Sequence, residues 1–219
     1  MLKISLLAAT ALIGLSACTY DVRGSGENRS VESAGMVASR QVDVPGDAEF
    51  SGMFVGADGR VGRDLELSGA TVRANVSVGR NLEASGGRLR FAGQVGGDAE
   101  ISAGTAHVDA EIAGDAEVAA GRVTLDGRIG GRLEMDGGHM ELRADVMGPV
   151  EIRGHGRREG NGRVEISGRL AQGGTICVAE VEIRPGARID GPLHVISDNR
   201  PEGEGVTWEA LNGRDCETL

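Results

Sequence analysis

The chain repeats itself every seventeen residues over about residues 44–154. Each block opens on Val or Ile, and its sixth residue is a glutamate between two apolar or small residues. The blocks begin at Val44, Val61, Val78, Val95, Ile112, Ile129 and Val146, and the glutamates are Glu49, Glu66, Glu83, Glu100, Glu117, Glu134 and Glu151. Such a triplet is typical of a short β-strand that turns its acidic residue to solvent and its neighbours to a core. We therefore expect an outward acidic column of seven glutamates.

A strand of three residues cannot bury its apolar side alone, so the blocks must stack as coils of a solenoid. Glycines recur near block positions 3, 9 to 10 and 16, where they accept the dihedral angles of corners. We predict an all-β fold, a right-handed parallel β-helix with a triangular cross-section and about nine coils of seventeen residues. The left-handed β-helix of hexapeptide acyltransferases needs eighteen residues per coil and does not fit this period. At ~4.8 Å per coil, the rod would be on the order of 40 Å long.

The composition suits a narrow solenoid. The 219 residues include 37 Gly but only three Phe, one Trp and one Tyr, so Val, Ile, Leu and Ala must fill the core. Disordered chains can share such a composition, but they lack a fixed apolar period.

The first seventeen residues are typical of an export signal. Lys3 supplies a short positive region, and residues 4–15 form an apolar run too short to span a bilayer as a mature helix. The run Leu15, Ser16, Ala17, Cys18 then resembles the lipobox of bacterial lipoproteins. This resemblance implies cleavage before Cys18 and acyl chains on that residue, of which two or more give stable membrane anchoring. Thr19 follows where many inner-membrane lipoproteins carry Asp, which favours the periplasmic side of the outer membrane.

We divide the remaining chain into three parts: a flexible tether after the lipidated cysteine over residues 18–43, a β-helix domain over residues 44–196, and a cap or tail over residues 197–219. The tether assignment rests on polar, Ser- and Gly-rich sequence without a period. Without the signal the chain keeps 22 Arg against 33 acidic residues, a net charge near −11. This charge argues against nucleic acid as a partner and against a polybasic lipid-binding patch.

The register of the repeat is ambiguous between residues 150 and 189. Val150 and Val164 begin similar triplets only fourteen residues apart. Either the coils shorten here, or residues 154–162 loop out and the next triplet lies on a different side of the triangle. The high Gly content and the Arg157, Arg158, Glu159 tip favour an exposed loop.

The last residues contain the only tryptophan, Trp208. Either Trp208 covers the end of the solenoid together with Val206 and Leu211, or the tail is disordered and its tryptophan is incidental. Cys177 and Cys216 remain once Cys18 is lipidated. In an oxidising compartment they either pair or stay as separate thiols. Cys177 is the middle residue of a triplet and should point outward, so a disulfide requires the tail to fold back along the rod.

Catalytic and metal-binding patterns are weak. His107, His139, His155 and His194 occupy different block positions without paired Cys or carboxylate at metal-ligand spacing, so we expect no metal site and no cofactor. β-Helical polysaccharide lyases and hydrolases use an external groove, and this chain lacks the long loops that build such grooves.

The glutamate column should repel itself by about 1 kcal/mol per neighbouring pair even in water. Arg63, Arg80 and Arg128 at adjacent corners could pair with it, divalent cations could bridge it, or it could be a solvated face that prevents sideways aggregation.

The repeat region, about residues 44–196, resembles the bactofilins, a family of polymer-forming bacterial scaffolds. The likeness lies in Val-Gly-Gly-Asp-type corners followed by an apolar, polar, apolar triplet, as in residues 95–101 and 112–118. It implies a compact triangular β-helix that joins end to end without nucleotide and serves as a scaffold for envelope or cell-shape proteins. Two features depart from the family: bactofilins are typically cytoplasmic whereas this chain has a lipobox, and the C-terminal tail would cap one end.

The sequence thus favours a non-enzymatic, envelope-anchored structural scaffold that self-associates or binds envelope proteins. The alternatives are a binding module or adhesin that presents the side of the β-helix, and a polysaccharide-active enzyme. Self-association would use the coil of residues 44–60, which we expect to be the first. There Phe50, at an inward position, and Phe54, near a corner, form an apolar layer at the end of the core. They would serve as an assembly surface or as the plug of a monomer.

Overall fold

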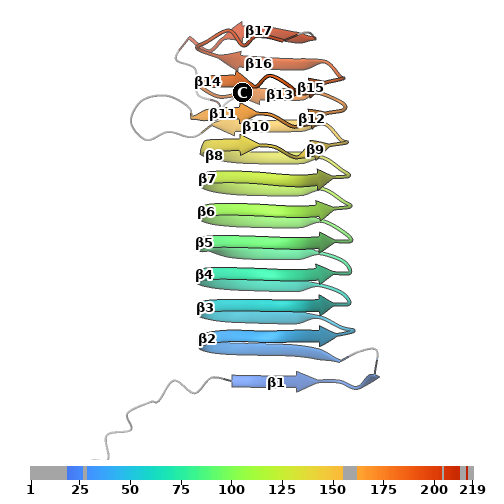
Figure 1. Cartoon of the computed structure of the whole chain (residues 1–219). Coiled ribbons are helices and arrows are strands. Elements are labelled where there is room, and N and C mark those ends of the chain that lie inside the picture. Colours follow the sequence, from blue (N-terminus) through green and yellow to red (C-terminus); the bar gives the residue numbers. More distant parts are fainter. Residues whose placement is uncertain (1–18, 27–28, 155–161, 204, 213–215, 217–219) are drawn as a thin grey trace, which may run out of the picture.

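A computed structural model describes residues 19–26, 29–154, 162–203, 205–212 and 216. These residues form a right-handed parallel β-helix of about ten turns, so the predicted fold is confirmed (Figure 1). Residues 1–17, predicted to be a signal peptide, together with Cys18 and His155, lie outside the described residues. Among the described residues, no helix has the length and apolarity needed to span a membrane.

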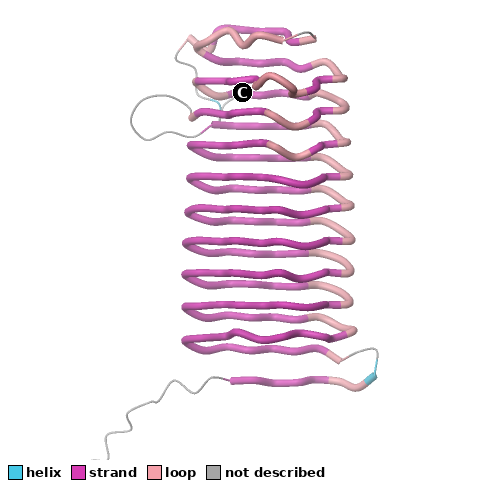
Figure 2. The backbone as a smooth tube through the Cα atoms, viewed as in Figure 1, coloured by secondary structure: helices cyan, strands magenta, loops and turns pink. Residues whose placement is uncertain are grey.

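The coils stack in chain order from the N-terminal to the C-terminal end of the rod (Figures 1 and 2). The long strands are β2 (Ser30–Val44), β3 (Ala48–Val61), β4 (Leu65–Val78), β5 (Leu82–Val95), β6 (Ala99–Ile112), β7 (Ala116–Ile129) and β8 (Leu133–Leu142). The short strands are β1 (Thr19–Arg23), β9 (Asp145–Val146), β10 (Val150–Gly154), β11 (Arg163–Ile166), β12 (Arg169–Leu170), β13 (Gly174–Cys177), β14 (Glu180–Ile183), β15 (Arg188–Ile189), β16 (Leu193–Ser197) and β17 (Val206–Ala210).

Each coil has three sides. In the later coils the sides are separate strands, since β10, β11 and β12 make one turn and β13, β14 and β15 make the next. In the earlier coils one long strand bends around the same corners. The first corner is a residue without a ladder partner between two paired stretches, such as Met53 opposite Ala70. The loop of Gly62, Arg63 and Asp64 closes the coil. The predicted corner positions are therefore confirmed.

Strands β2 to β8 pair in parallel with an unbroken offset of seventeen residues. This register places equivalent residues of successive coils above one another, so each block position becomes a column along the rod. Inward columns form one continuous core that includes the fully buried Phe50 and Phe91. Each is accompanied by a small inward residue in its own coil, Ala57 beside Phe50 and Ala84 beside Phe91, which keeps the core volume per coil similar.

At the second corner, glycine alternates with residues that carry a buried Cβ. Gly59, Gly93 and Gly127 have φ angles of 125°, 137° and 105°. A Cβ on Gly93 would lie 2.2 Å from the carbonyl oxygen of Val76 in the preceding coil. The intervening coils place Val76 and Ala110 at this corner, and the coils before and after place Val42 and Ala144 there, all buried. Glycine is thus required in every second coil, and this corner repeats over two coils rather than one.

The β-helix begins earlier than the sequence predicted. Residues 30–43, expected to be tether, belong to β2, which pairs in parallel with β3 in the same seventeen-residue register. Strand β1 then runs antiparallel to β2, with Thr19 opposite Ala34. The sequence of this coil is mostly polar, because only a few of its side chains point inward and need to be apolar. Val31, Ala38 and Val42 are among these buried residues.

The ambiguous register is resolved in favour of the loop. Strand β10 pairs with the first half of β8, and β11 pairs with its second half, with Val164 opposite Met140. The chain therefore gains residues at one corner and resumes on the next side of the same coil. Residues 155–161 of this loop lie outside the described part of the chain.

The C-terminal end of the rod is covered. Strand β17 pairs in parallel with β16. In this position the side chain of Trp208 packs against the core, and its Nε1–H donates a hydrogen bond to Ser197 Oγ at 3.2 Å. On the next side, the Asn199 amide donates to the carbonyl of Val181 and accepts from its N–H, both at 2.9 Å. One side chain thereby satisfies the strand edge as another strand would.

Candidate functional site: an acidic groove along the rod

We call the side of the rod that begins at block position 5, where strands β3 to β8 start, the first side. A groove of about 920 Å³ runs along this side across seven coils. Its floor is the buried column at block position 5, such as Ala48 and Leu65. Its walls are the columns at positions 4 and 6. The carboxylates that line it are the glutamates 32, 49, 66, 83, 100, 117 and 134 and the aspartates 47, 64, 98 and 115. The sequence predicts no loop-built groove of the kind found in polysaccharide-active β-helices. This groove is of another kind, because two columns of side chains form its walls.

The position-4 column is held by a ladder of side-chain hydrogen bonds. In each coil the side-chain Oδ1 accepts the backbone N–H of the equivalent residue in the next coil. The ladder runs from Asp47 through Asp64, Asn81, Asp98 and Asp115 to the N–H of Arg132, at 3.3, 3.1, 3.1, 2.8 and 2.7 Å. It ends there because arginine has no acceptor. The ladder orients these carboxylates and leaves the Oδ2 atoms of Asp98 and Asp115 without an ion pair among the described residues.

The position-6 glutamates form the outward column that the sequence predicted. All seven are exposed or half-buried, and the register places them directly opposite one another from coil to coil. Glu32 extends the column by one coil, opposite Glu49. We missed Glu32 because its block lacks an apolar residue after the glutamate, where Ser33 stands instead.

Arginines neutralise the two ends of this column and leave its middle uncompensated. Arg23 lies 3.1 Å from Glu32, and Arg153 lies 2.8 Å from Glu134 and also contacts Glu151. From Glu49 to Glu117, no ion pair occurs with any described residue. The predicted partners Arg63 and Arg80 instead contact Asp47 and Asp64 of the neighbouring column, at 3.0 and 3.8 Å. The third predicted partner, Arg128, makes no ion pair within the described part of the chain.

One glutamate of the column, Glu66, has a shifted pKa. Burial, followed by the charges of Glu49 and Glu83, raises the pKa of the Glu66 carboxyl above its ordinary value. The second side of the rod differs in its last coils, because there Glu165 and Glu182 lie beside arginines. Arg184 contacts Glu165 at 2.7 Å and Glu182 at 3.2 Å, and it lowers the pKa of Glu165. The acidic groove is therefore a property of one side.

The groove does not gather its carboxylates into a compact cluster. In the described ranges, no group of three or more His, Cys, Asp or Glu side chains could hold one metal ion. Columns spaced at ~4.8 Å spread their charge along a line. Such an arrangement suits an extended cationic ligand better than a single ion.

The cysteine pair is joined. Cys177 and Cys216 form a disulfide whose Cα atoms are 5.5 Å apart. Cys177 does leave the core column, as the sequence predicted, but it is buried because Ile196, Leu211 and Cys216 pack around it. The tail therefore folds back along the side of the rod.

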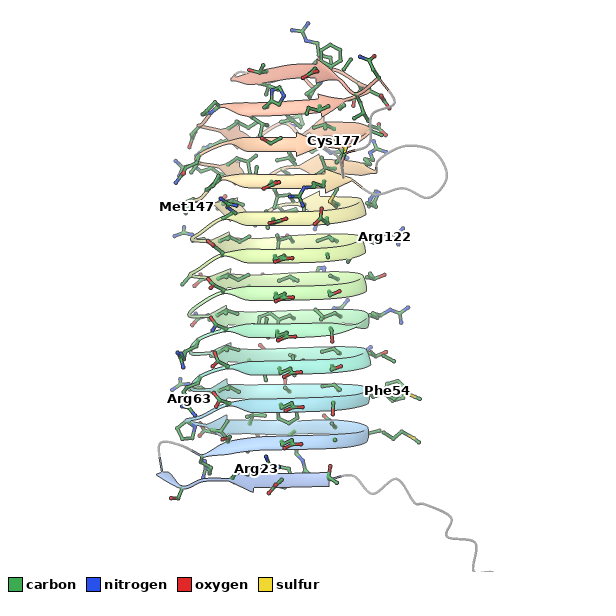
Figure 3. All side chains as sticks on the ribbon, turned by 180° about the vertical axis from the view of Figure 1, so that it is seen from behind. Arg23, Phe54, Arg63, Arg122, Met147 and Cys177 are labelled. Carbon is green, nitrogen blue, oxygen red and sulfur yellow. A yellow bond between two sulfur atoms is a disulfide. The ribbon has the colours of Figure 1, made fainter. Side chains whose placement is uncertain are left out.

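The two phenylalanines do not form a common layer at the end of the rod. Phe50 is fully buried in the second coil, whereas Phe54 is half-exposed at a lateral corner (Figure 3). The prediction that they close the N-terminal end is wrong, because β2 forms another coil below them.

No protein-family model matches the chain, and neither does any curated protein or solved structure at a significant level.

Proposed function

We propose that this protein is a non-enzymatic structural scaffold, anchored in the cell envelope through Cys18 and similar in kind to the bactofilins. The observation that carries this proposal is the continuous rod, in which seven coils keep one register and place equivalent block positions above one another along each side. Such a rod resists bending because every coil is hydrogen-bonded to its neighbours. It would hold envelope partners at fixed spacing from the outer membrane, on its periplasmic side.

Anchorage is tested by changing Cys18→Ser in the full chain. We expect loss of acyl labelling and release of the protein from membranes. Cys216→Ser is the matched control, since it removes another cysteine and leaves the lipobox intact. Equal labelling and equal membrane retention of Cys18→Ser and the wild type would refute the anchor.

Self-association of the rods is tested by electron microscopy and sedimentation of a soluble chain that starts at Thr19. The covered C-terminal end opposes growth into filaments, because β17 and Asn199 occupy strand edges that another copy would need. Short assemblies through the N-terminal end are therefore favoured over long polymers.

A binding module is the second candidate function, and the acidic groove is the observation that favours it. Its glutamates recur in every coil and spread negative charge along the groove. A groove of this charge attracts cationic polymers such as basic peptide segments. Formation of reducing sugars or unsaturated products from envelope polysaccharides would contradict both non-enzymatic functions.

The groove is tested with a lysine oligomer as the probe, measured by calorimetry at low ionic strength. Glu83→Gln with Glu100→Gln removes two charges from the centre of the groove and should weaken binding several-fold. Asp109→Asn with Glu111→Gln removes the same charge from another side and should change affinity much less. Equal weakening by both pairs would show that only net charge matters and would overturn the groove as a site.

A further inference from the structure

The exposed large hydrophobic side chains of the described residues all lie near the N-terminal end of the rod. They are Tyr20, Val22, Met36, Val37, Met53 and Phe54, with exposed fractions of 44–62 %. Four of them gather at the first corner of the two lowest coils, where Val37 is directly opposite Phe54. We call Met36, Val37, Met53 and Phe54 the corner patch. Figure 3 shows Phe54 pointing away from the rod at this corner.

The stretches of chain that carry the corner patch contain no charged residue. Residues 33–39 and 50–57, which form the corner and its flanks, contain no Asp, Glu, Lys, Arg or His. Farther up the rod the same corner column continues with Thr71, Arg88, Thr105, Arg122 and His139. The apolar character is therefore confined to the coils nearest the start of the described chain.

The chain enters the rod at this corner. Because β1 is antiparallel to β2, its first residue lies toward the corner, with Thr19 opposite Ala34 and Arg23 opposite Ser30. Thr19 is thus close to Met36, and Cys18 precedes it directly. The long tether expected from the sequence does not exist between Cys18 and the rod. An acyl group on Cys18 would hold this corner near the membrane surface.

We propose that the corner patch lies against a lipid bilayer and fixes the orientation of the rod on the membrane. This inference rests on the proposed anchorage at Cys18. Bulky apolar side chains without nearby charge enter the boundary between headgroups and acyl chains favourably. A second copy of the chain fits the patch less well, because four half-exposed side chains fall far short of the ~800 Å² per partner buried in stable interfaces.

Tyr20, an exposed residue of β1 near the corner patch, also suits a position at the membrane surface. The Arg40 guanidinium carbon lies 4.6 Å from the ring centroid of Tyr20, so a cation covers one face of an exposed ring in β1. Tyrosine and arginine both tolerate the membrane interface, where an apolar body meets a polar tip. With this end on the bilayer, the disulfide-linked end would stand roughly nine coil spacings away.

The test uses tryptophan fluorescence of the full lipidated chain in phosphatidylcholine vesicles with brominated acyl chains. Phe54→Trp places a reporter in the corner patch, and Arg122→Trp places one at the same corner four coils higher (Figure 3). The native Trp208, at the opposite end, serves as the background in every sample. We expect bromine to quench Phe54→Trp at least twofold more than Arg122→Trp or the wild type.

Each other outcome overturns the inference in a distinguishable way. If the vesicles retain the protein but Phe54→Trp is quenched no more than the wild type, the anchor stands and the patch does not touch lipid. If the protein does not float with the vesicles, the anchor itself fails, and the inference fails with it. If Phe54→Trp is shielded without lipid and sedimentation shows a dimer, a second copy covers the patch.

Discussion

At the scale of single residues, two columns with opposite energetic effects lie side by side. The position-4 aspartates stabilise the stack because each carboxylate accepts an N–H of the next coil. The position-6 glutamates oppose it because like charges face one another without counter-ions in the middle of the rod. The fold tolerates the second column because these side chains reach solvent and salt screens them.

Replacement of Glu66 with Gln should stabilise the protein at neutral pH by about 0.5 kcal/mol at low salt. The pKa of Glu66 is raised in the folded state, so the folded chain binds this proton more tightly than the unfolded chain. The contribution of Glu66 to the free energy of unfolding is thus present at low pH, and it is lost as the pH rises through the raised pKa. Denaturant unfolding at several pH values should show the advantage of Glu66→Gln growing with pH.

Glu165→Gln is the control with the opposite sign. Its pKa is lowered by the hydrogen bond from Arg184, so its contribution is present above the unfolded pKa and is lost as the pH falls through the folded pKa. Glu165→Gln should therefore destabilise the protein at neutral pH. Stabilisation by both variants would mean that net charge, not the column, sets the effect.

Gly93→Ala should destabilise the rod by about 2–4 kcal/mol. A Cβ at this position would combine an unfavourable positive φ with a 2.2 Å approach to a backbone oxygen of the preceding coil. Gly186→Ala separates the two causes, since Gly186 also has a positive φ but a Cβ there meets nothing within 4 Å. It should cost only about 1 kcal/mol. Equal costs in chemical denaturation would show that strain alone decides.

At the scale of strands and coils, the seventeen-residue period was enough to predict the parallel β-helix, its corners and the outward glutamates. The period predicts the structure well because a constant register gives the same block position the same environment in every coil. The first coil escaped prediction because Ser33 follows Glu32 where the later blocks place an apolar or small residue, so this block lacks the repeated triplet. The groove escaped because its position-4 wall depends on hydrogen bonds between coils, which no single block displays.

The disulfide should stabilise the C-terminal coils by about 2–4 kcal/mol, since it links residues 39 apart. Cys216→Ser should therefore lower the midpoint of thermal unfolding, and a reducing agent should lower the wild type to the same value. The reductant should not change the variant further. A wild type insensitive to reduction would indicate that the packing of Leu211 and Ile196 holds the tail without the bond.

At the scale of the whole molecule, the rod has two unlike ends. The C-terminal end is covered by β17, by Asn199 and by the disulfide-linked tail. At the N-terminal end, β1 covers only residues 30–34 of β2, and residues 37–44 have no ladder partner on that edge among the described strands. This polarity distinguishes the chain from a building block with two equal ends.

Removal of residues 198–219 should expose the C-terminal strand edges and allow end-to-end association. The truncated chain should also carry Cys177→Ser, so that a free thiol cannot cross-link copies. The full-length Cys177→Ser, Cys216→Ser variant is the control, since it loses the bond but keeps the cap. Sedimentation should show larger species for the truncated chain alone. Identical masses at high concentration would refute the cap as the barrier to assembly.

The alternation of glycine at the second corner also limits how such a rod can change its length in evolution. Loss of one coil, for example residues 82–98, would preserve the strand register and the aspartate ladder. It would also place Ala110 directly above Val76, so that two side chains met where one side chain and one glycine met before. Loss of residues 82–115 would place Gly127 above Val76 and restore the alternation. Insertions and deletions should therefore be tolerated as multiples of 34 residues, which makes the heritable unit of length a pair of coils.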